Sequence, residues 1–174
     1  MAKHGVVRTD NMAGTDVRAD LVSIEYLGAN GQTETAIDNG CVLKVGPLKG
    51  DATNGYEREI YVGSAPAANT NRDEVVLVCS PEVMYDERLR SLADFYNEAG
   101  QPCRGYRFHR GGIFSVTKEV LDGVATPAIG NIVELKAGIK MNVVASATSG
   151  STVIGEIIAI DVVGPHTYYV VRIA

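Results

Sequence analysis

The sequence predicts a mainly β protein with a minor α/β portion. Glycine accounts for 19 of the 174 residues, a larger share than the roughly 7% that is usual. A high glycine content is typical of turn-rich β structure. Hydrophobic residues make up 45% of the chain and charged residues 21%, a balance that excludes a disordered protein. We expect three parts: an extended N-terminal arm at residues 1–20, a small mixed α/β domain at residues 21–111 and a small C-terminal β-barrel at residues 112–174.

Residues 1–20 form the predicted arm, because they follow neither the period of a strand nor that of a helix for long. At about 3.3 Å per residue, a segment of this length could reach on the order of 60 Å. Its apolar side chains Val6, Val7 and Met12 are our candidates for contacts with a partner. A frayed terminus that docks on nothing is the alternative.

The portion at residues 21–111 is expected to begin with short strands. Turn-forming sequences such as Asn30-Gly31 and Gly46-Pro47 separate these strands. The expected strands are Leu21–Leu27, Cys41–Val45, Glu59–Gly63 and Glu74–Cys79.

One helix is expected within Pro81–Ala99. Ser80 precedes Pro81 as a capping residue precedes proline at the first helical position. Gly100 then provides a residue suited to ending a helix. Four apolar residues recur between them at the spacing of one helix face: Leu89, Leu92, Ala93 and Tyr96.

The composition changes near residue 112. The remaining stretch holds 11 Val and 9 Ile, residues that fit a pleated and half-buried surface. Short strands with regular turns between them favour a closed or nearly closed barrel. The expected strands are Ile113–Thr117, Ile132–Leu135, Lys140–Ala145, Val153–Val163 and Thr167–Ile173.

The sequence predicts no catalytic site, no metal site and no cofactor. A serine or cysteine nucleophile needs a histidine base, and no Gly-x-Ser-x-Gly motif accompanies His4, His109 or His166. The three cysteines include no Cys-x-x-Cys pair, so zinc binding and thioredoxin-type chemistry have no support. We therefore expect a protein that is not an enzyme, with an unrecognised hydrolase as the least favoured alternative.

Charge and hydropathy limit the partners. The formal net charge is -5 and the pI is about 5.2, so the overall field does not favour binding to duplex DNA. The most apolar stretch contains Glu156 and Asp161 and is too short to cross a membrane. The first residues lack the apolar core of a signal peptide, which predicts synthesis in the cytoplasm without export through a cleaved signal peptide.

The basic segment Arg104–Arg110 is the most distinctive local cluster. Its guanidinium and aromatic groups could stack on bases and pair with phosphates, as in single-strand binders. The interpretation that we favour is pairing with acids of the same chain or of a neighbouring subunit. Arg104 and Arg107, together with Tyr56, are therefore our candidates for subunit or partner contacts.

The chain resembles the head decoration (capsid cement) proteins of tailed bacteriophages. The resemblance is one of overall pattern, covers most of the chain, and is carried by three segments: MAKHGVVRTDNMAGT, EVVLVCSPEVMYDERLRSLADFYNEAGQPCRGYR and IFSVTKEVLDG with the following GNIVELKAGIKMNVV. It implies a structural protein on the capsid exterior that binds the major capsid protein and stabilises the head. It also implies a homo-oligomer, with a trimer as one frequent form.

Two other functions remain open at this stage. One is a head fibre or neck component of the same virion. The other is a small nucleic-acid-binding protein that uses the Arg104–Arg110 segment.

Overall fold

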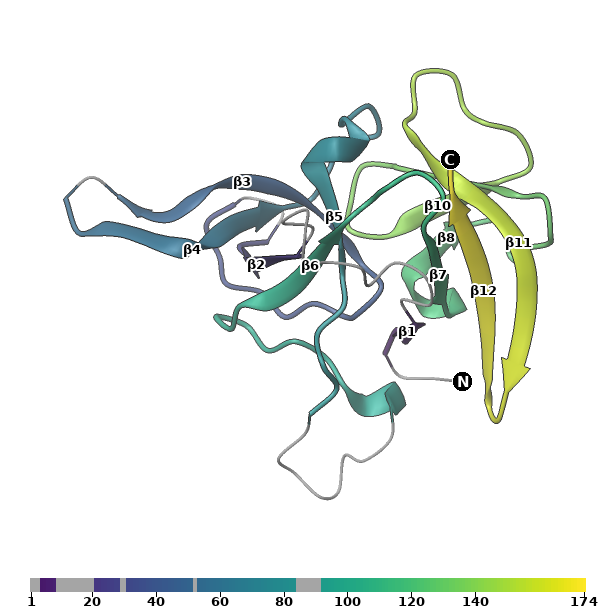
Figure 1. The fold of residues 1–174 in the computed structure, drawn as a ribbon, viewed down its shortest axis with the longest axis horizontal. Coiled ribbons are helices and arrows are strands. Elements are labelled where there is room, and N and C mark those ends of the chain that lie inside the picture. Colours follow the sequence, from purple (N-terminus) through teal and green to yellow (C-terminus); the bar gives the residue numbers. More distant parts are fainter. Residues whose placement is uncertain (1–3, 9–20, 29–30, 52, 84–91) are drawn as a thin grey trace.

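The chain forms two β units that share one core, a five-stranded closed barrel and a seven-stranded sheet (Figure 1). The computed structural model describes residues 4–8, 21–28, 31–51, 53–83 and 92–174. The barrel strands are β2 (Leu21–Tyr26), β3 (Val42–Asp51), β4 (Gly55–Ser64), β5 (Val75–Val78) and β6 (Cys103–Arg107). The sheet strands are β1 (Val7–Arg8), β7 (Ile113–Val116), β8 (Leu121–Gly123), β9 (Ile132–Glu134), β10 (Met141–Val144), β11 (Val153–Val163) and β12 (His166–Ile173).

The barrel has the order β2-β4-β3-β5-β6 and closes where β2 pairs with β6. Its interior is narrow, and two glycines face it because no side chain fits there. A Cβ at Gly105 would lie 2.6 Å from Cγ2 of Val76, and one at Gly63 would lie 2.9 Å from Cγ1 of Ile24. Leu43 also reaches this space, at 2.9 Å from the same Gly63 position. The glycines therefore allow the apolar side chains to fill the barrel.

The hairpin formed by β3 and β4 projects away from the barrel, toward the left of Figure 1. The register of this pair shifts between Val45 and Leu48, which places Gly46-Pro47 in a bulge. Proline lacks a backbone N–H and is tolerated at such irregularities. The distal residues of the hairpin are mostly exposed.

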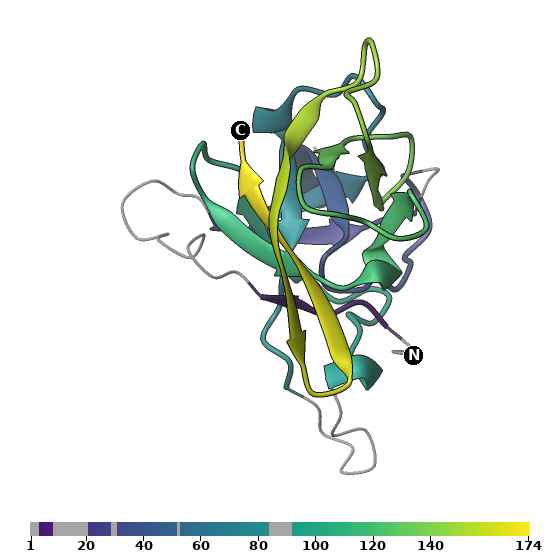
Figure 2. The ribbon, with the colours of Figure 1, turned by 90° about the vertical axis from the view of Figure 1, so that its right-hand side faces the viewer.

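The sheet has the order β1-β7-β12-β11-β9-β10-β8. Its longest element is the hairpin of β11 and β12, which turns at Gly164-Pro165. Strand β9 pairs with β11 only as far as Glu156, so Ala159–Val163 pairs with β12 alone. Figure 2 shows this distal half extending past the strands of the sheet.

The described N-terminal residues, 4–8, lie between the two units. Val7 pairs with Val116 of β7, and Val6 exchanges bonds with Thr117 on the same edge of the sheet. On the barrel side, Nδ1 of His4 lies 3.0 Å from Oδ1 of Asp38. This segment therefore adds a strand to the chain's own sheet and connects that sheet to the barrel.

The mainly β class is confirmed, but the predicted position of the barrel is wrong. The barrel comprises strands from residues 21–107, and residues 112–174 contribute six strands of the open sheet. Closure depends on the pairing of Leu21 with Tyr106, far apart in the sequence. Such long-range pairing leaves no local signal in the composition of either segment.

The predicted helix is not found in the described part of its range, residues 81–83 and 92–99, and residues 84–91 lie outside the described residues. The one helical element there is a 3-10 turn at Leu92–Asp94. The other 3-10 turns are Arg72–Glu74 and Lys118–Val120. Asn97 instead forms an isolated bridge with Ile37, which requires extended backbone at this point.

Candidate functional site

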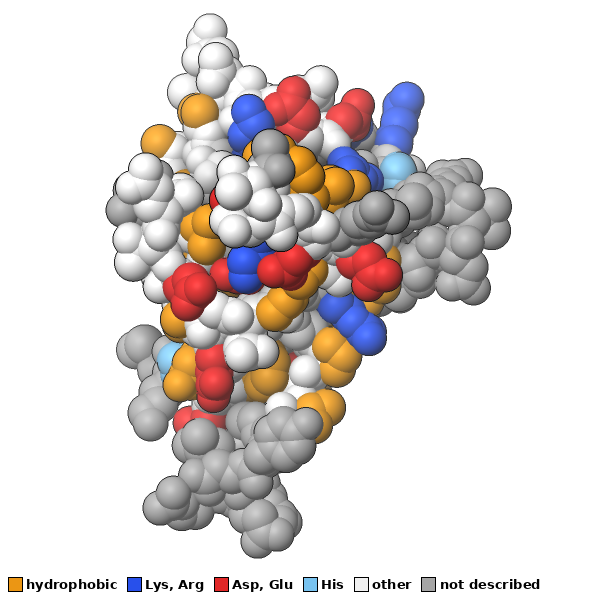
Figure 3. All heavy atoms as spheres, turned by 90° about the vertical axis from the view of Figure 1, so that its left-hand side faces the viewer, with side chains coloured by type: hydrophobic (Ala, Val, Ile, Leu, Met, Phe, Trp, Pro, Cys, Tyr) orange, Lys and Arg blue, Asp and Glu red, His pale blue; other side chains and the backbone are white. Residues whose placement is uncertain are grey.

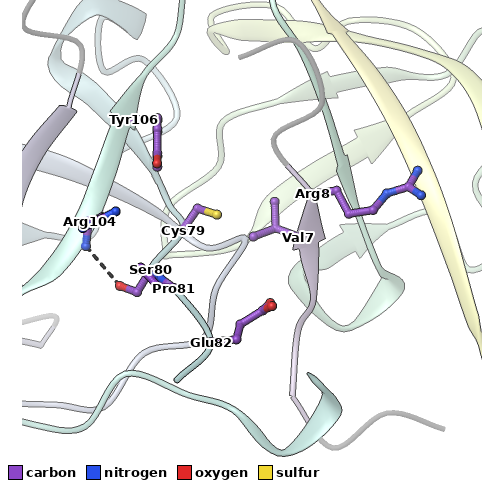
Figure 4. A pocket seen from close by; sticks show the side chains of 8 residues that line it. All are labelled: Val7, Arg8, Cys79, Ser80, Pro81, Glu82, Arg104 and Tyr106. Carbon is purple, nitrogen blue, oxygen red and sulfur yellow. Dashed lines mark hydrogen bonds between the residues drawn. The ribbon is translucent and has the colours of Figure 1, made fainter. Parts of the chain in front are cut away.

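A groove of about 450 Å³ lies between the edge strand β1 and the outer face of the barrel (Figure 4). It is open to solvent on one side. Its lining comes from β1, from the segment after β5 and from β6: Val7, Arg8, Cys79, Ser80, Pro81, Glu82, Arg104 and Tyr106.

Strand β6 supplies the wall of the groove through its alternation. Cys103 and Gly105 are buried toward the barrel interior, so Arg104 and Tyr106 stand on the outer face. The backbone N–H of Arg104 donates to Oγ of Ser80 at 3.1 Å. The Arg104 guanidinium makes no ion pair or hydrogen bond within the part of the chain that the structure describes.

A buried amide network holds the part of the wall next to β6, at Ser80. Asn39 is fully buried, and its Oδ1 accepts the backbone N–H of Ser80 at 2.9 Å. Its Nδ2 donates to the Ser80 carbonyl at 2.9 Å, so the side chain mimics a paired strand. Nδ2 of Asn97 donates to Oδ1 of Asn39 at 3.1 Å. The wall is therefore fixed before any partner arrives.

The pKa values of Cys79 and Glu82, the two acidic groups that line the groove, are raised, which does not favour nucleophilic chemistry. Burial, with a smaller contribution from Glu82, raises the pKa of the Cys79 thiol to about 11, against the lowering effect of Arg104. The thiol is therefore protonated at neutral pH, and a thiol in this form is a poor nucleophile. Burial also raises the pKa of Glu82, partly offset by a hydrogen bond with Asn39. The groove offers a guanidinium, a phenol and apolar surface, which is chemistry for recognition.

The tip of the β3–β4 hairpin carries an aromatic side chain. Tyr56 is 55% exposed and lies opposite Gly50, which has no side chain to cover it. Asp51 pairs with the neighbouring Gly55, and its carboxylate accepts bonds from the backbone N–H groups of Thr53 and Asn54. Figure 3 looks onto this end of the molecule, where acidic side chains lie interspersed with basic and hydrophobic ones.

The tip of the β11–β12 hairpin is apolar. Val162 is 74% exposed and Val163 is 52% exposed, and Ile160 adds to the same strand. Asp161 lies between them, and its Oδ2 is bound at 3.0 Å by the Arg8 guanidinium. Exposed apolar strands of this kind are unusual unless a partner covers them.

The structure separates the residues predicted as contacts. Val6 and Val7 are buried in the chain's own core, so the expectation that they reach a partner is wrong for this conformation. They are buried because the segment completes the edge of β7. Met12 lies outside the described residues. Tyr56 is exposed, as a contact residue must be.

The basic segment is divided between two faces. Arg104 lines the groove, whereas a guanidinium N–H of Arg107 donates to the Asp73 carbonyl at 2.8 Å. Phe108 is 2% exposed and packs against Phe114 with ring centroids 5.8 Å apart. A buried ring cannot stack on a base, so Phe108 cannot contribute to an aromatic platform for single-stranded nucleic acid.

Sequence reasoning missed the Cys79–Glu82 wall and the apolar hairpin tip. Ser80-Pro81 is a helix-start signal in isolation, and only tertiary bonds to Asn39 assign it to the groove. Val162 and Val163 belong to an apolar strand sequence like that of a buried strand. The sequence therefore does not show that this end of β11 projects beyond the sheet.

Comparison with known proteins finds no matching family model, no similar curated protein and no similar solved structure. Within the described ranges, no three His, Cys, Asp or Glu side chains are placed to hold a metal ion. No helix in those ranges has the length and apolar character needed to cross a membrane.

Proposed function

We propose that this protein is a structural component of a tailed-phage virion that binds the outside of the capsid lattice and stabilises the head. The observation that carries the proposal is the β11–β12 hairpin, which presents exposed Val162 and Val163 beyond its sheet. The resemblance of the sequence to head decoration proteins supports the major capsid protein as the partner that this hairpin contacts. The acidic net charge of -5 suits a protein outside the DNA-filled shell.

The hairpin can bind through its side chains and its backbone. Burying apolar surface contributes about 25 cal/mol per Å². Ile157 still bonds to the backbone of Gly130 and Asn131. Beyond Ile157 the edge of β11 has no neighbouring strand among the described residues, so it can accept a strand of the partner. Many copies on a repeating lattice turn a modest single contact into high avidity, above all if each copy belongs to a homo-oligomer.

The test is addition of the purified protein to capsids of the parent phage assembled without it, with sedimentation of the capsids as the readout. We expect the wild-type protein to co-sediment and Val162→Asp to bind at least about 10-fold more weakly, because a buried carboxylate costs more than 1.4 kcal/mol. Ile129→Asp is the matched control, since Ile129 is 64% exposed but lies outside this hairpin.

Two results would contradict the proposal. Wild-type protein that stays in the supernatant would remove capsid binding altogether. Equal binding of Val162→Asp and Ile129→Asp would show that this hairpin is not the contact. Deletion of residues 1–20 is not a clean test, because it removes Val6 and Val7 from the core.

A further inference from the structure

We propose that copies of this chain associate head to tail, with Tyr56 at the β3–β4 hairpin tip of one copy seated in the groove of the next. The groove is the one lined by Val7, Pro81, Arg104 and Tyr106. This assignment goes beyond capsid binding, because it specifies a contact between copies that forms without any capsid.

Tyr56 has the properties of an anchor. It is a large aromatic side chain, 55% exposed, on a tip whose other residues are small or polar. Tyrosine is enriched among the residues that dominate binding energy, because it buries a rigid ring and keeps one polar group for a hydrogen bond. No ring or hydrogen-bond contact of Tyr56 occurs among the described residues.

The groove has the volume and the chemistry for a phenol. Its volume of about 450 Å³ exceeds what one aromatic side chain fills, so part of the hairpin tip can enter with the ring. Pro81 supplies exposed apolar surface, and Tyr106 supplies a second aromatic ring. The carboxylate of Glu82 points toward this space in Figure 4 and can accept a hydrogen bond from the phenol.

Charge complementarity between the hairpin tip and the groove favours this orientation of the two copies. Arg104 carries a guanidinium with no partner among the described residues, at the wall of the groove. Asp51 lies beside Tyr56 at the hairpin tip, and its bonds from Asn54 and Thr53 keep it ionised. A carboxylate on the entering tip and a guanidinium at the receiving wall form a favourable contact.

The hairpin tip of one copy cannot reach the groove of the same copy. Figure 1 separates the hairpin tip, at the far left, from β1 and its groove near the centre of the molecule. The contact therefore joins two different surfaces of two copies. Such heterologous contacts build closed rings when the rotation closes and open chains when it does not, and a trimer is one such ring.

The first experiment measures the molar mass of the full-length protein by light scattering over a range of concentrations. We expect wild type to self-associate, and Tyr56→Ser and Arg104→Glu each to raise the dissociation constant about 30-fold, as for a binding hot spot. Val162→Ser is the matched control, an exposed apolar residue on the other hairpin, and we expect it to associate as wild type does.

The second experiment uses charge exchange. Asp51→Lys and Arg104→Glu should each stay monomeric, whereas a mixture of the two should associate into pairs, open chains or even-numbered rings. When the two variants alternate in such assemblies, each contact joins unlike charges. A two-fold contact in which Asp51 meets Asp51, or Arg104 meets Arg104, does not predict this rescue. Thermal unfolding confirms that each variant is folded.

Protection of Cys79 supplies an independent readout, since its thiol lines the groove. Its alkylation should be slower in the associated wild type than in monomeric Tyr56→Ser. The proposal is overturned by a monomeric wild type, by association of Tyr56→Ser and Arg104→Glu at wild-type strength, or by a mixture that stays monomeric. These results leave capsid binding through Val162 to its own assay, so the two proposals fail separately.

Discussion

The Nζ atom of Lys49 lies 2.6 Å from Oε2 of Glu25, a carboxylate on the barrel strand β2 that is 1% exposed. The second oxygen, Oε1, has no hydrogen-bond partner among the residues that the structure describes. Glu57 lies farther from the same ammonium group, at 3.8 Å. Among the described residues, Lys49 therefore supplies the close positive charge for this buried anion, and it joins the projecting β3–β4 hairpin to the barrel.

The first prediction concerns this ion pair. Lys49→Met should lower the free energy of unfolding by about 2–3 kcal/mol, because it leaves Glu25 buried and unpaired. The double variant Glu25→Gln/Lys49→Met should recover part of this loss, since no buried charge remains. Urea unfolding at neutral pH measures all three proteins. A double variant less stable than Lys49→Met would contradict this assignment.

The same pair predicts a change at alkaline pH. The hydrogen bond with Glu25 is the main reason why the pKa of Lys49 is raised, although burial acts in the opposite direction. The contribution to stability is therefore complete below the ordinary lysine pKa of 10.5 and is lost as the pH rises through the higher folded-state value. Unfolding midpoints above pH 10 should fall more steeply in wild type than in Glu25→Gln/Lys49→Met.

The hydrogen bonds of Glu134 predict that the stability of the protein changes at acid pH. Burial tends to raise its pKa, but bonds from the Thr148 backbone and hydroxyl and from Asn142 outweigh burial and lower the pKa. Its contribution is therefore present above the ordinary glutamate pKa of 4.5 and is lost as the pH falls through the lower folded-state value. Glu134→Gln should flatten the loss of stability between pH 5 and pH 3, which urea unfolding at each pH would reveal.

The close packing around Gly5 leads to a prediction about the N-terminal segment and the surface that it contacts. A Cβ at this position would lie 2.1 Å from Cγ1 of Val120 and 2.8 Å from the Asn39 carbonyl oxygen. Gly5→Ala should cost about 1–3 kcal/mol of stability, as overpacking does in other cores. Hydrogen exchange should then be faster at β7, which loses its neighbour β1. The double variant Gly5→Ala/Val120→Ala should relieve part of the overlap, and failure to do so would place the strain at the backbone contact.

The cysteines should react slowly and in a fixed order. Burial is the main reason why the pKa values of Cys41 and Cys103 are about 12 and that of Cys79 is about 11. At pH 8 all three thiols are protonated in the folded protein, and only Cys79 is not fully buried. Alkylation followed by mass spectrometry should find Cys79 labelled first, and all three labelled in denaturant.

The strands were predictable because they leave a local signal. Alternating or continuous apolar residues with turns between them predicted the strands near β2, β5, β11 and β12. The ends of β3 and β4 were not predictable, because the bulge at Gly46-Pro47 lets a strand continue through a sequence that usually ends one. Pairing between distant strands set the position of the barrel, and no single segment encodes it.

The candidate site was predictable only in part. Tyr56 stands out as an exposed aromatic residue and Arg104 as a cation with no ion pair among the residues that the structure describes, and the sequence singled out both. The wall at Ser80 was not predictable, because its helix-start signal is satisfied by Asn39 instead of by a helix. Arg107 was expected to pair with acids of the chain or of a subunit, whereas the bond that the structure gives its guanidinium is to the backbone carbonyl of Asp73.

The pairing of Val7 with Val116 has a consequence for how the protein is made. After β1 has been synthesised, more than a hundred further residues must leave the ribosome before its neighbour β7 exists. Contacts of such separation in sequence slow folding, and an open β edge exposed during the delay invites aggregation. Slowing translation downstream of β7 should therefore improve the soluble yield more than slowing it upstream.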